Sequence, residues 1–275
     1  MCVGAATQAE APYLAGSKSE KMGCMTDDVR LHREWLLSHI DLPKAGLIVD
    51  LGCGTGEDVI VLADHRPGAT NRFVGLDASE KNLAVAREAA SGDSRIDFRQ
   101  YRIEGSLPFP DASVDAVYSN NFVECLPDPS EFAREIARVL LPGGSLVIAY
   151  WDWDSQAFDG TDKALIRRLV HAYSDWQQAW MAYADGWMGR RLWGTFKFAG
   201  FFQGTVHARV LTNTVYAEPW YGYARAHDFS YLVEKGVASA EDYRQFIGGL
   251  EDLQEQGRYF YSITGYPYVG RRLGA

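Results

Sequence analysis

The sequence predicts an α/β fold, a Rossmann-like, doubly wound and mostly parallel sheet of seven strands with helical lid insertions. Three observations predict it. Short apolar segments alternate with helical patterns from residue 47 to residue 150, a glycine-rich segment joins the first strand to the next helix, and 47% of the 275 residues are hydrophobic, enough for a large core. Strands separated by helices of this length form parallel crossovers with helices on both faces of the sheet.

The first half of the chain contains the alternating elements. Apolar residues recur at helical spacing from Val29 to Ile40, and Pro43 and Gly46 end this helix. The apolar run over residues 47–51 is typical of a buried strand. The spacing then predicts helices over residues 57–65, 80–90 and 130–140, and strands over residues 72–77, 96–100, 114–119 and 145–150, the last preceded by a turn at 141–144.

The second half of the chain is richer in aromatic residues than the first. Its patterns predict helices over residues 163–184, 190–199, 220–235 and 240–256, and strands over residues 204–214 and 259–269. We expect residues 1–26 to form a flexible N-terminal arm and residues 27–275 to form a single domain. Within it, residues 151–187 and 216–236 are predicted to be helical insertions that form a substrate lid.

Composition and charge exclude several classes of partner. With 36 acidic and 27 basic residues, the net charge of −9 disfavours binding to nucleic acid or to an anionic membrane. No apolar run approaches the ~20 residues that a membrane span needs. Four scattered cysteines fit reduced thiols, and no set of His, Asp and Glu has metal-ligand spacing. We therefore expect a cytoplasmic monomer or homodimer without a metal ion.

The most specific motif is Val-Asp-Leu-Gly-Cys-Gly-Thr-Gly at residues 49–56. Glycines between a strand and a helix let the chain turn sharply and let a ligand approach the backbone, and the helix N-terminus favours an anionic group. The spacing fits neither a dinucleotide fingerprint nor a P-loop. Asp77 ends the next strand, where a carboxylate can accept both hydroxyls of a ribose; the alternative is a helix cap at Asp77 or Ser79. These elements indicate a site for a nucleoside with a short anionic or zwitterionic chain.

The segment from Ile48 to Tyr150 resembles the class I S-adenosylmethionine-dependent methyltransferases, in the type 11 group that includes the ubiquinone and menaquinone methyltransferases. The matching motifs are residues 49–56, Gly-Leu-Asp-Ala-Ser at 75–79, Leu-Pro-Phe-Pro-Asp at 107–111, and Phe-x-Arg-Glu-Ile-x-Arg-Val-Leu-x-Pro-Gly-Gly at 132–144. Residues 189–192 and 265–271 resemble the C-terminal parts of bacterial members less closely. The resemblance implies S-adenosylmethionine as the cofactor.

The resemblance also implies which residues bind this cofactor. Its methionine and ribose parts would be lined by Asp50, Gly52, Cys53, Gly54 and Gly56, with Asp77 on the ribose, Ala78 near the adenine and Asn120 facing the methionine part. Family members usually carry an acidic residue before the Leu-Pro pair, and this acidic residue binds the adenine amino group. This chain departs from that pattern, and the backbone of Ile103 and the side chain of Glu104 are the candidates.

The second substrate is expected beyond the carboxyl ends of the fourth and fifth strands. Residues 150–154 place three aromatic and two acidic side chains there. We predict Tyr150 and Asp152 as catalytic residues and Asn121, Trp151, Trp153 and Trp180 as substrate-binding residues. A general base is needed only for a nucleophile that carries a proton, and Glu124, His207 and His227 are further candidates. The alternative is a packed loop whose acids cap the next helix.

The sequence leaves three functions open. The first is methyl transfer to an O, N or C nucleophile of a small molecule in secondary metabolism. The second keeps the cofactor but uses its sulfonium for cyclisation, as in azetidine-2-carboxylate synthases, which release methylthioadenosine. The third is a non-catalytic protein that retains the nucleoside site.

Overall fold

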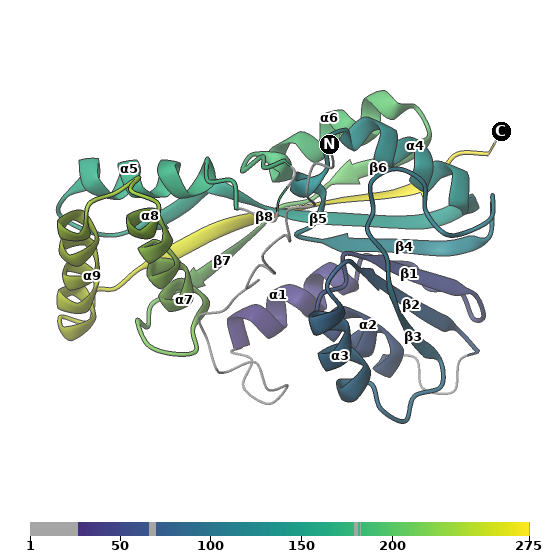
Figure 1. The fold of residues 1–275 in the computed structure, drawn as a ribbon, viewed down its shortest axis with the longest axis horizontal. Helices are drawn as coiled ribbons and strands as arrows, with labels where there is room; N and C mark the ends of the chain where they lie inside the picture. Colours follow the sequence, from purple (N-terminus) through teal and green to yellow (C-terminus); the bar gives the residue numbers. More distant parts are fainter. Residues whose placement is uncertain (1–26, 66–69, 179–180, 182, 275) are drawn as a thin grey trace, which may run out of the picture.

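One eight-stranded sheet runs through the computed structural model (Figure 1). The structure describes residues 27–65, 70–178, 181 and 183–274, so the predicted N-terminal arm and Trp180 lie outside the described residues. The strand order is β3-β2-β1-β4-β5-β8-β6, and β7 also pairs with β8. Strands β1 to β5 run parallel, whereas β8 is antiparallel to β5, β6 and β7. The predicted Rossmann-like fold is confirmed.

The strands are β1 (Leu47–Leu51), β2 (Arg72–Asp77), β3 (Ile96–Gln100), β4 (Val114–Asn120), β5 (Leu140–Phe158), β6 (Phe202–Val206), β7 (Arg209–Asn213) and β8 (Tyr261–Arg272). The helices are α1 (Asp27–Leu37), α2 (Glu57–Asp64), α3 (Glu80–Ala89), α4 (Pro129–Val139), α5 (Lys163–Ser174), α6 (Met188–Ala199), α7 (Tyr221–Asp228), α8 (Ser230–Glu234) and α9 (Ala240–Glu255). A short 3₁₀ helix, η1, spans Val123–Cys125.

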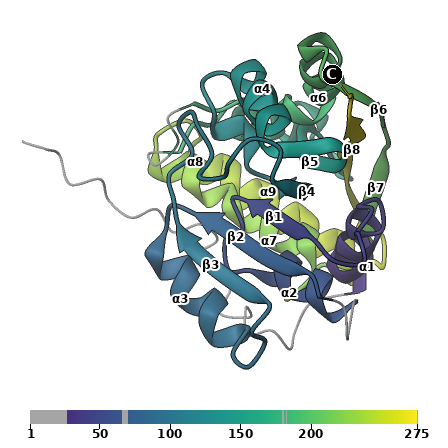
Figure 2. The same cartoon turned by 90° about the vertical axis from the view of Figure 1, so that its right-hand side faces the viewer.

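The central parallel strands β1, β2 and β4 are largely buried on both faces because they are mostly apolar, whereas the edge strand β3 is mostly exposed. Ile48 of β1 belongs to a core with residues of α1, α2 and α3, whereas its neighbour Val49 belongs to a core with α4 and α6. Figures 1 and 2 show these two helical layers on opposite sides of the sheet. The carboxyl ends of β1, β2, β4 and β5 therefore meet at one edge of a rigid layer.

A second lobe is built on the extended ends of β5 and β8, at the left of Figure 1. There β7, α5, α7, α8 and α9 enclose a third core, in which the ring of Phe158 lies 4.7 to 5.8 Å from those of Phe229, Phe246 and Tyr261. In the described part of the chain, no helix is both long and apolar enough to cross a bilayer.

The structure of this second lobe differs from the helical lid that the sequence predicts over residues 151–187. Residues 151–158 continue β5 as a strand, because Trp151 and Asp152 pair with Gly265 and Thr264 of β8. The predicted turn at 141–144 also lies within β5, where Gly143 has a φ of +79° and the register with β4 shifts. The helix predicted over 163–184 ends at Ser174, and Trp176 beyond it stacks on Tyr231 of α8.

Two further predicted elements are each divided in two. The strand predicted over 204–214 forms β6 and β7, which pair with different parts of β8. Pro267 of β8 lies between these two ladders and has no N–H to donate, which explains the break. The sheet therefore has eight strands instead of seven. The helix predicted over 220–235 forms α7 and α8, which meet at the fully buried Phe229.

Candidate functional site

The predicted glycine loop lies between β1 and α2, and β2 holds it in place. The N–H groups of Gly52 and Cys53 both donate to the carbonyl oxygen of Leu76, at 2.8 and 2.9 Å. Gly52, Gly54 and Gly56 have φ angles of +76°, +54° and +82°. Side-chain-bearing residues rarely adopt this conformation, so the sharp turn depends on glycine.

The three glycines serve different purposes. A Cβ on Gly52 would lie 2.6 Å from the ring of Phe122, and one on Gly56 would lie 2.6 Å from the ring of Phe98. These two positions are closed by packing against the sheet. Among the residues that the structure describes, a Cβ on Gly54 would have nothing within 4 Å, so the backbone at Gly54 borders space that a ligand can enter.

This difference predicts opposite effects for two alanine substitutions. We expect Gly52→Ala to lower the free energy of unfolding by about 1–3 kcal/mol, because the methyl group overpacks the Phe122 contact. Gly54→Ala should cost only the strain of its positive φ but weaken S-adenosylmethionine binding at least tenfold. Urea unfolding and titration calorimetry on both variants measure this, and equal effects on affinity would contradict the assignment of Gly54 to the ligand face.

Asp77 connects the second strand to the glycine loop. Its Oδ2 accepts a hydrogen bond from the Gly54 N–H at 2.9 Å, and its Oδ1 accepts one from the Ser79 N–H at 2.8 Å. The N-cap of α3 is Ser79, whose hydroxyl accepts from the Asn82 N–H. Each carboxylate oxygen has a second lone pair. Asp77 can therefore hold the loop and still accept ribose hydroxyls, as predicted.

Acidic side chains surround the loop. Asp50 at the end of β1 is 4% exposed, and burial, followed by the negative charges of Asp58 and Asp77, raises its pKa well above the usual range. One cation opposes this, since Arg33 of α1 pairs with Asp58 of α2 at 2.5 Å. A set of acceptors this rich in carboxylates fits a ligand that carries an ammonium and a sulfonium group, as S-adenosylmethionine does.

Cys53 lies within this loop, but its side chain points into the core. The Sγ atom packs so closely on Gly75 of β2 that a Cβ added to this glycine would lie only 2.7 Å from it. Cys53 is 8% exposed. Burial raises the pKa of this thiol, so it is a neutral packing group. Any contribution of Cys53 to the predicted cofactor site comes from its backbone.

The predicted adenine side is lined by residues after β2 and β3. Ala78 is exposed, and its carbonyl oxygen accepts from Gln100 Nε2 at 3.1 Å. The side chain of Ile103 belongs to the core, which leaves its backbone as the part available to a ligand. Glu104 is exposed, with Arg102 at 3.8 Å. Both candidates that the sequence offered for the adenine contact thus remain predictions.

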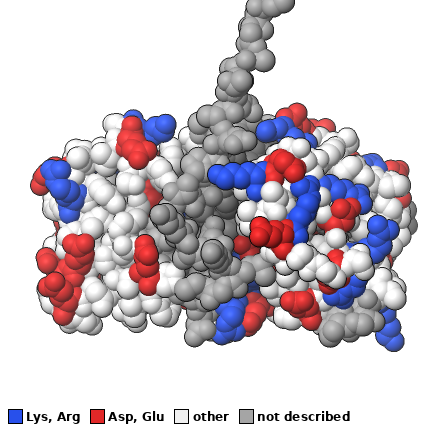
Figure 3. All heavy atoms as spheres, turned by 60° about the horizontal axis from the view of Figure 1, so that its bottom comes forward, with Lys and Arg blue, Asp and Glu red and all other residues white. Residues whose placement is uncertain are grey.

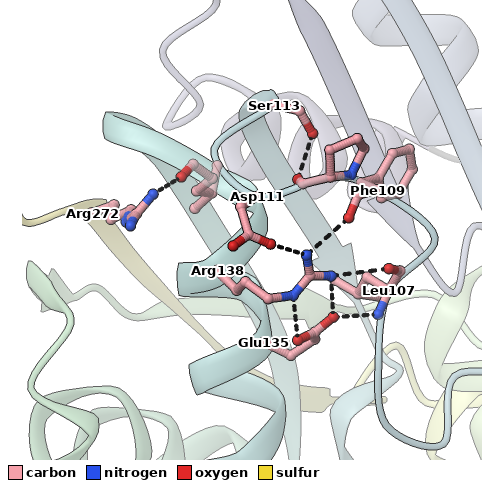
Figure 4. A network of polar contacts seen from close by, with 9 residues as sticks. Leu107, Phe109, Asp111, Ser113, Glu135, Arg138 and Arg272 are labelled. Carbon is pink, nitrogen blue, oxygen red and sulfur yellow. Dashed lines mark hydrogen bonds and ion pairs between the residues drawn. The ribbon is translucent and has the colours of Figure 1, made fainter.

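Arg138 of α4 fixes the loop that follows this edge (Figure 4). Its guanidinium donates to the carbonyl oxygens of Leu107 and Phe109 at 3.1 and 3.0 Å and forms ion pairs with Asp111 and Glu135. Glu135 in turn accepts from the Leu107 N–H at 2.5 Å. The matching motifs at 107–111 and 132–144 are therefore partners in one anchor beside the predicted adenine side.

The ends of β4 and β5 are joined by asparagines. Asn120 pairs with Ala149 in the parallel ladder, and Asn121 turns the chain with a φ of +54°. The Oδ1 of Asn121 accepts from the Trp151 N–H at 3.4 Å. Both predicted asparagines thus lie at the carboxyl edge of the sheet, close to the glycine loop.

Tyr150 lies in a buried polar cluster at this edge. Its hydroxyl is hydrogen-bonded to the carboxylate of Glu124 in η1, and the indole N–H of Trp153 donates to the same hydroxyl at 3.4 Å. Burial raises the pKa of Glu124 to about 7. Glu124 was only one of several base candidates in the sequence, and its contact with Tyr150 is visible only in the fold.

Asp152 is held differently from what a free catalytic base requires. It is 1% exposed, and both of its carboxylate oxygens accept hydrogen bonds from the Arg190 guanidinium of α6, one of them at 2.5 Å. A bidentate arginine pair fixes a carboxylate and stabilises its charge. The geometry gives Asp152 the part of a structural anchor between β5 and α6.

Trp151 extends the site toward α1 and α7. Its ring is 5% exposed, stacks on His32 at 4.2 Å, and lies 5.4 Å from the ring of Tyr221. Burial, followed by the charges of Arg209 and Arg33, lowers the pKa of His32 to about 3, so this ring is neutral at pH 7. Sequence reasoning missed His32 and Tyr221, because nothing in their local pattern separates them from packing residues.

The remaining candidates lie elsewhere. His207 stacks on His39 at 4.5 Å, and the ring of His227 lies tilted against that of Tyr223 at 4.0 Å within the second lobe. Among the residues that the structure describes, no three His, Cys, Asp or Glu side chains form a metal site. The prediction of a metal-free protein stays a prediction.

Comparisons with known proteins identify the family. Residues 49–148 match the family model described as a methyltransferase domain. The chain is 30% identical over 181 residues to an uncharacterized 37.1 kDa protein in transposon TN4556 of Streptomyces fradiae, covering 66% of this chain and 50% of that protein. It is 34% identical over 122 residues to a demethylmenaquinone methyltransferase of Bacillus licheniformis, covering 42% of this chain and 50% of the relative. The chain thus spans about half the length of these curated relatives.

A solved structure supports the same conclusion at the level of the fold. The YcgJ protein of Bacillus subtilis superposes with a TM-score of 0.58 at 16% identity, over 90% of this chain and 100% of that one. The segment that matches the family model contains the glycine loop, Asp77 and the end of β4, and it stops at residue 148 within β5. Residues 49–148 therefore form a methyltransferase domain, as the resemblance to the class I S-adenosylmethionine-dependent methyltransferases implies, and S-adenosylmethionine is the cofactor that fits this family.

Proposed function

We propose that the chain transfers the methyl group of S-adenosylmethionine to an O, N or C nucleophile of a small molecule in secondary metabolism. The observation that carries this proposal is the contact between the glycine loop and Asp77, in which the Gly54 N–H donates to Asp77 Oδ2 beside the open space at Gly54. This contact brings the carboxylate that we assign to the ribose next to the glycine loop at the carboxyl edge of the sheet, which supports the proposal.

The nature of the second lobe favours a small acceptor. Trp151, Trp153 and Tyr221 lie where the lobe joins the carboxyl edge, and aromatic rings can hold a flat or cationic molecule. Figure 3 shows acidic and basic side chains interspersed on one face of the molecule, with no continuous basic stripe among the residues described there. Together with the net charge of −9, this disfavours a nucleic-acid substrate.

The mechanism that we propose relies on alignment. When bound, S-adenosylmethionine supplies an electrophilic methyl group whose sulfur leaves with the bonding electron pair. Asp77, Asp50, Asn120 and the glycine loop would fix the position of that methyl group, while Asn121 and the aromatic rings would orient the acceptor and exclude water. No further charge needs stabilising on the leaving side, because the departing thioether is neutral.

We also propose a cytoplasmic location and a monomer or homodimer. The two cysteines in the described residues, Cys53 and Cys125, are both free, which is consistent with a reducing compartment.

The test is incubation of the purified chain with S-adenosylmethionine carrying an isotopically labelled methyl group and a panel of phenols, alcohols, amines and carboxylates. We expect label in an acceptor together with S-adenosylhomocysteine, and loss of both in Gly54→Ala. Methylthioadenosine formed without any acceptor would favour the cyclase instead. Tight cofactor binding with no turnover over the whole panel would favour a non-catalytic protein.

A further inference from the structure

The chain that follows β4 carries Glu124 to the edge where the cofactor binds. Asn121 turns the backbone with its φ of +54°, and Phe122 then packs on Gly52, whose added Cβ would touch its ring at 2.6 Å. Two residues later Glu124 lies in η1, directly beside the end of the parallel part of β5. In this segment, therefore, Phe122 packs against the glycine loop and Glu124 brings a carboxylate to the same edge of the sheet.

Two neutral polar side chains lie beside this carboxylate. Glu124 is 6% exposed, and the Tyr150 hydroxyl and the Trp153 indole, both from β5, interact with it. The charged or titratable groups that face it are Asp185, from the loop before α6, and Cys125 of its own element. Asp185 is negative and is paired with Arg191 at 2.5 Å.

The surroundings give Glu124 the properties of a proton acceptor. Burial and the nearby Asp185 raise its pKa to about 7, whereas the hydrogen bonds from Tyr150 and Trp153 lower it in part. A base with a pKa near the working pH accepts protons efficiently, and about half of its molecules are ionised at that pH. Asp152 lacks this freedom, because Arg190 holds both of its oxygens.

We propose that Glu124 accepts the proton of the methyl acceptor while the Tyr150 hydroxyl positions its carboxylate, so that the acceptor is a nucleophile bearing an O–H or N–H bond. This inference rests on the proposed function. The acceptor's lone pair forms the new bond to the methyl carbon, the methyl–sulfur bond breaks with its electrons on sulfur, and the acceptor's proton moves to Glu124. Solvent then removes that proton.

The same pair of acids disfavours one class of acceptor. A carboxylate is already ionised at pH 7 and needs no base, and Glu124 and Asp185 would repel it. Hydroxyl and amine acceptors lack this penalty. The proposal thus narrows the acceptor to neutral or cationic molecules that lose a proton on methylation.

The first test does not depend on turnover. We expect the indole ¹⁵N–¹H signal of Trp153, assigned with Trp153→Phe, to move with an inflection near pH 7 in the free protein. Glu124→Gln should abolish the inflection. Tyr150→Phe should move the inflection to higher pH, because the charged form of Glu124 loses a hydrogen bond. Saturating S-adenosylmethionine should move the inflection to lower pH than S-adenosylhomocysteine does, because only S-adenosylmethionine carries the sulfonium charge. An unchanged inflection in Glu124→Gln would overturn the proposal.

The second test uses the acceptor panel. We expect Glu124→Gln to reduce methylation of hydroxyl or amine acceptors about 100-fold or more, with S-adenosylmethionine affinity within twofold of the parent. Glu255→Gln, an exposed residue of α9, is the matched control and should change neither. Carboxylate-only methylation, or full activity of Glu124→Gln, would refute the inference and leave the proposed function standing. Absence of turnover by the parent protein over the panel would refute the proposed function itself, whatever Trp153 reports.

Discussion

Asp77→Ala is expected to weaken S-adenosylmethionine binding at least about 100-fold. Each hydrogen bond between a charged carboxylate and a ribose hydroxyl contributes about 1.5–3 kcal/mol, and the substitution removes two of them. It also releases the Gly54 N–H, which Asp77 Oδ2 holds at 2.9 Å, so the loop loses one of its links to β2 at the same time. Titration calorimetry on the free protein measures the affinity directly.

Ser79→Ala is the matched control for this experiment. It removes the N-cap of α3 and should lower the free energy of unfolding by about 1 kcal/mol, while leaving the carboxylate in place. If Asp77→Ala and Ser79→Ala changed the affinity equally, Asp77 would act only through the helix cap. An unchanged dissociation constant for Asp77→Ala would refute the ribose assignment.

Arg190→Ala is expected to lower the free energy of unfolding by about 3–5 kcal/mol, because it leaves the carboxylate of Asp152 buried without its partner. Asp152→Asn should cost less. The Arg190 side chain is 41% exposed and regains water when its partner becomes neutral, whereas the Asp152 side chain is 2% exposed and cannot. The order of the two effects therefore follows from the unequal burial of the two side chains.

Urea unfolding of both variants and of the double variant tests this order. Arg244→Ala removes an exposed pair with Glu241 and, as the control, should change stability by about 1 kcal/mol or less. A larger loss in Asp152→Asn than in Arg190→Ala would contradict the anchor. If Asp152→Asn kept full stability but lost turnover, the original prediction of a catalytic Asp152 would be preferred.

Much of the cofactor half could be predicted because its signals are local. The glycines at 52, 54 and 56 must adopt positive φ, and an acid at the end of β2 must face the loop in a parallel sheet. The difference in purpose between Gly52 and Gly54 could not be predicted, because it depends on Phe122, which lies far along the chain.

The acceptor half was less predictable because long-range pairing overrides local pattern there. Residues 151–158 resemble a loop leading into a lid, yet they form a strand because β8 pairs with them from more than a hundred residues away. The same pairing brings the Trp151 ring against His32 of α1 and Tyr221 of α7. Such contacts leave no periodicity in the sequence.

By itself, the sequence determined the parallel sheet, the glycine turn, the acid that follows it and hence the family and cofactor, because backbone conformation and hydrophobic spacing are properties of neighbouring residues. Only the tertiary structure decided which carboxylate at the carboxyl edge is free to take a proton. Asp152 and Glu124 are both buried acids, and they differ because Arg190 pairs with the first, whereas neutral Tyr150 and Trp153 contact the second.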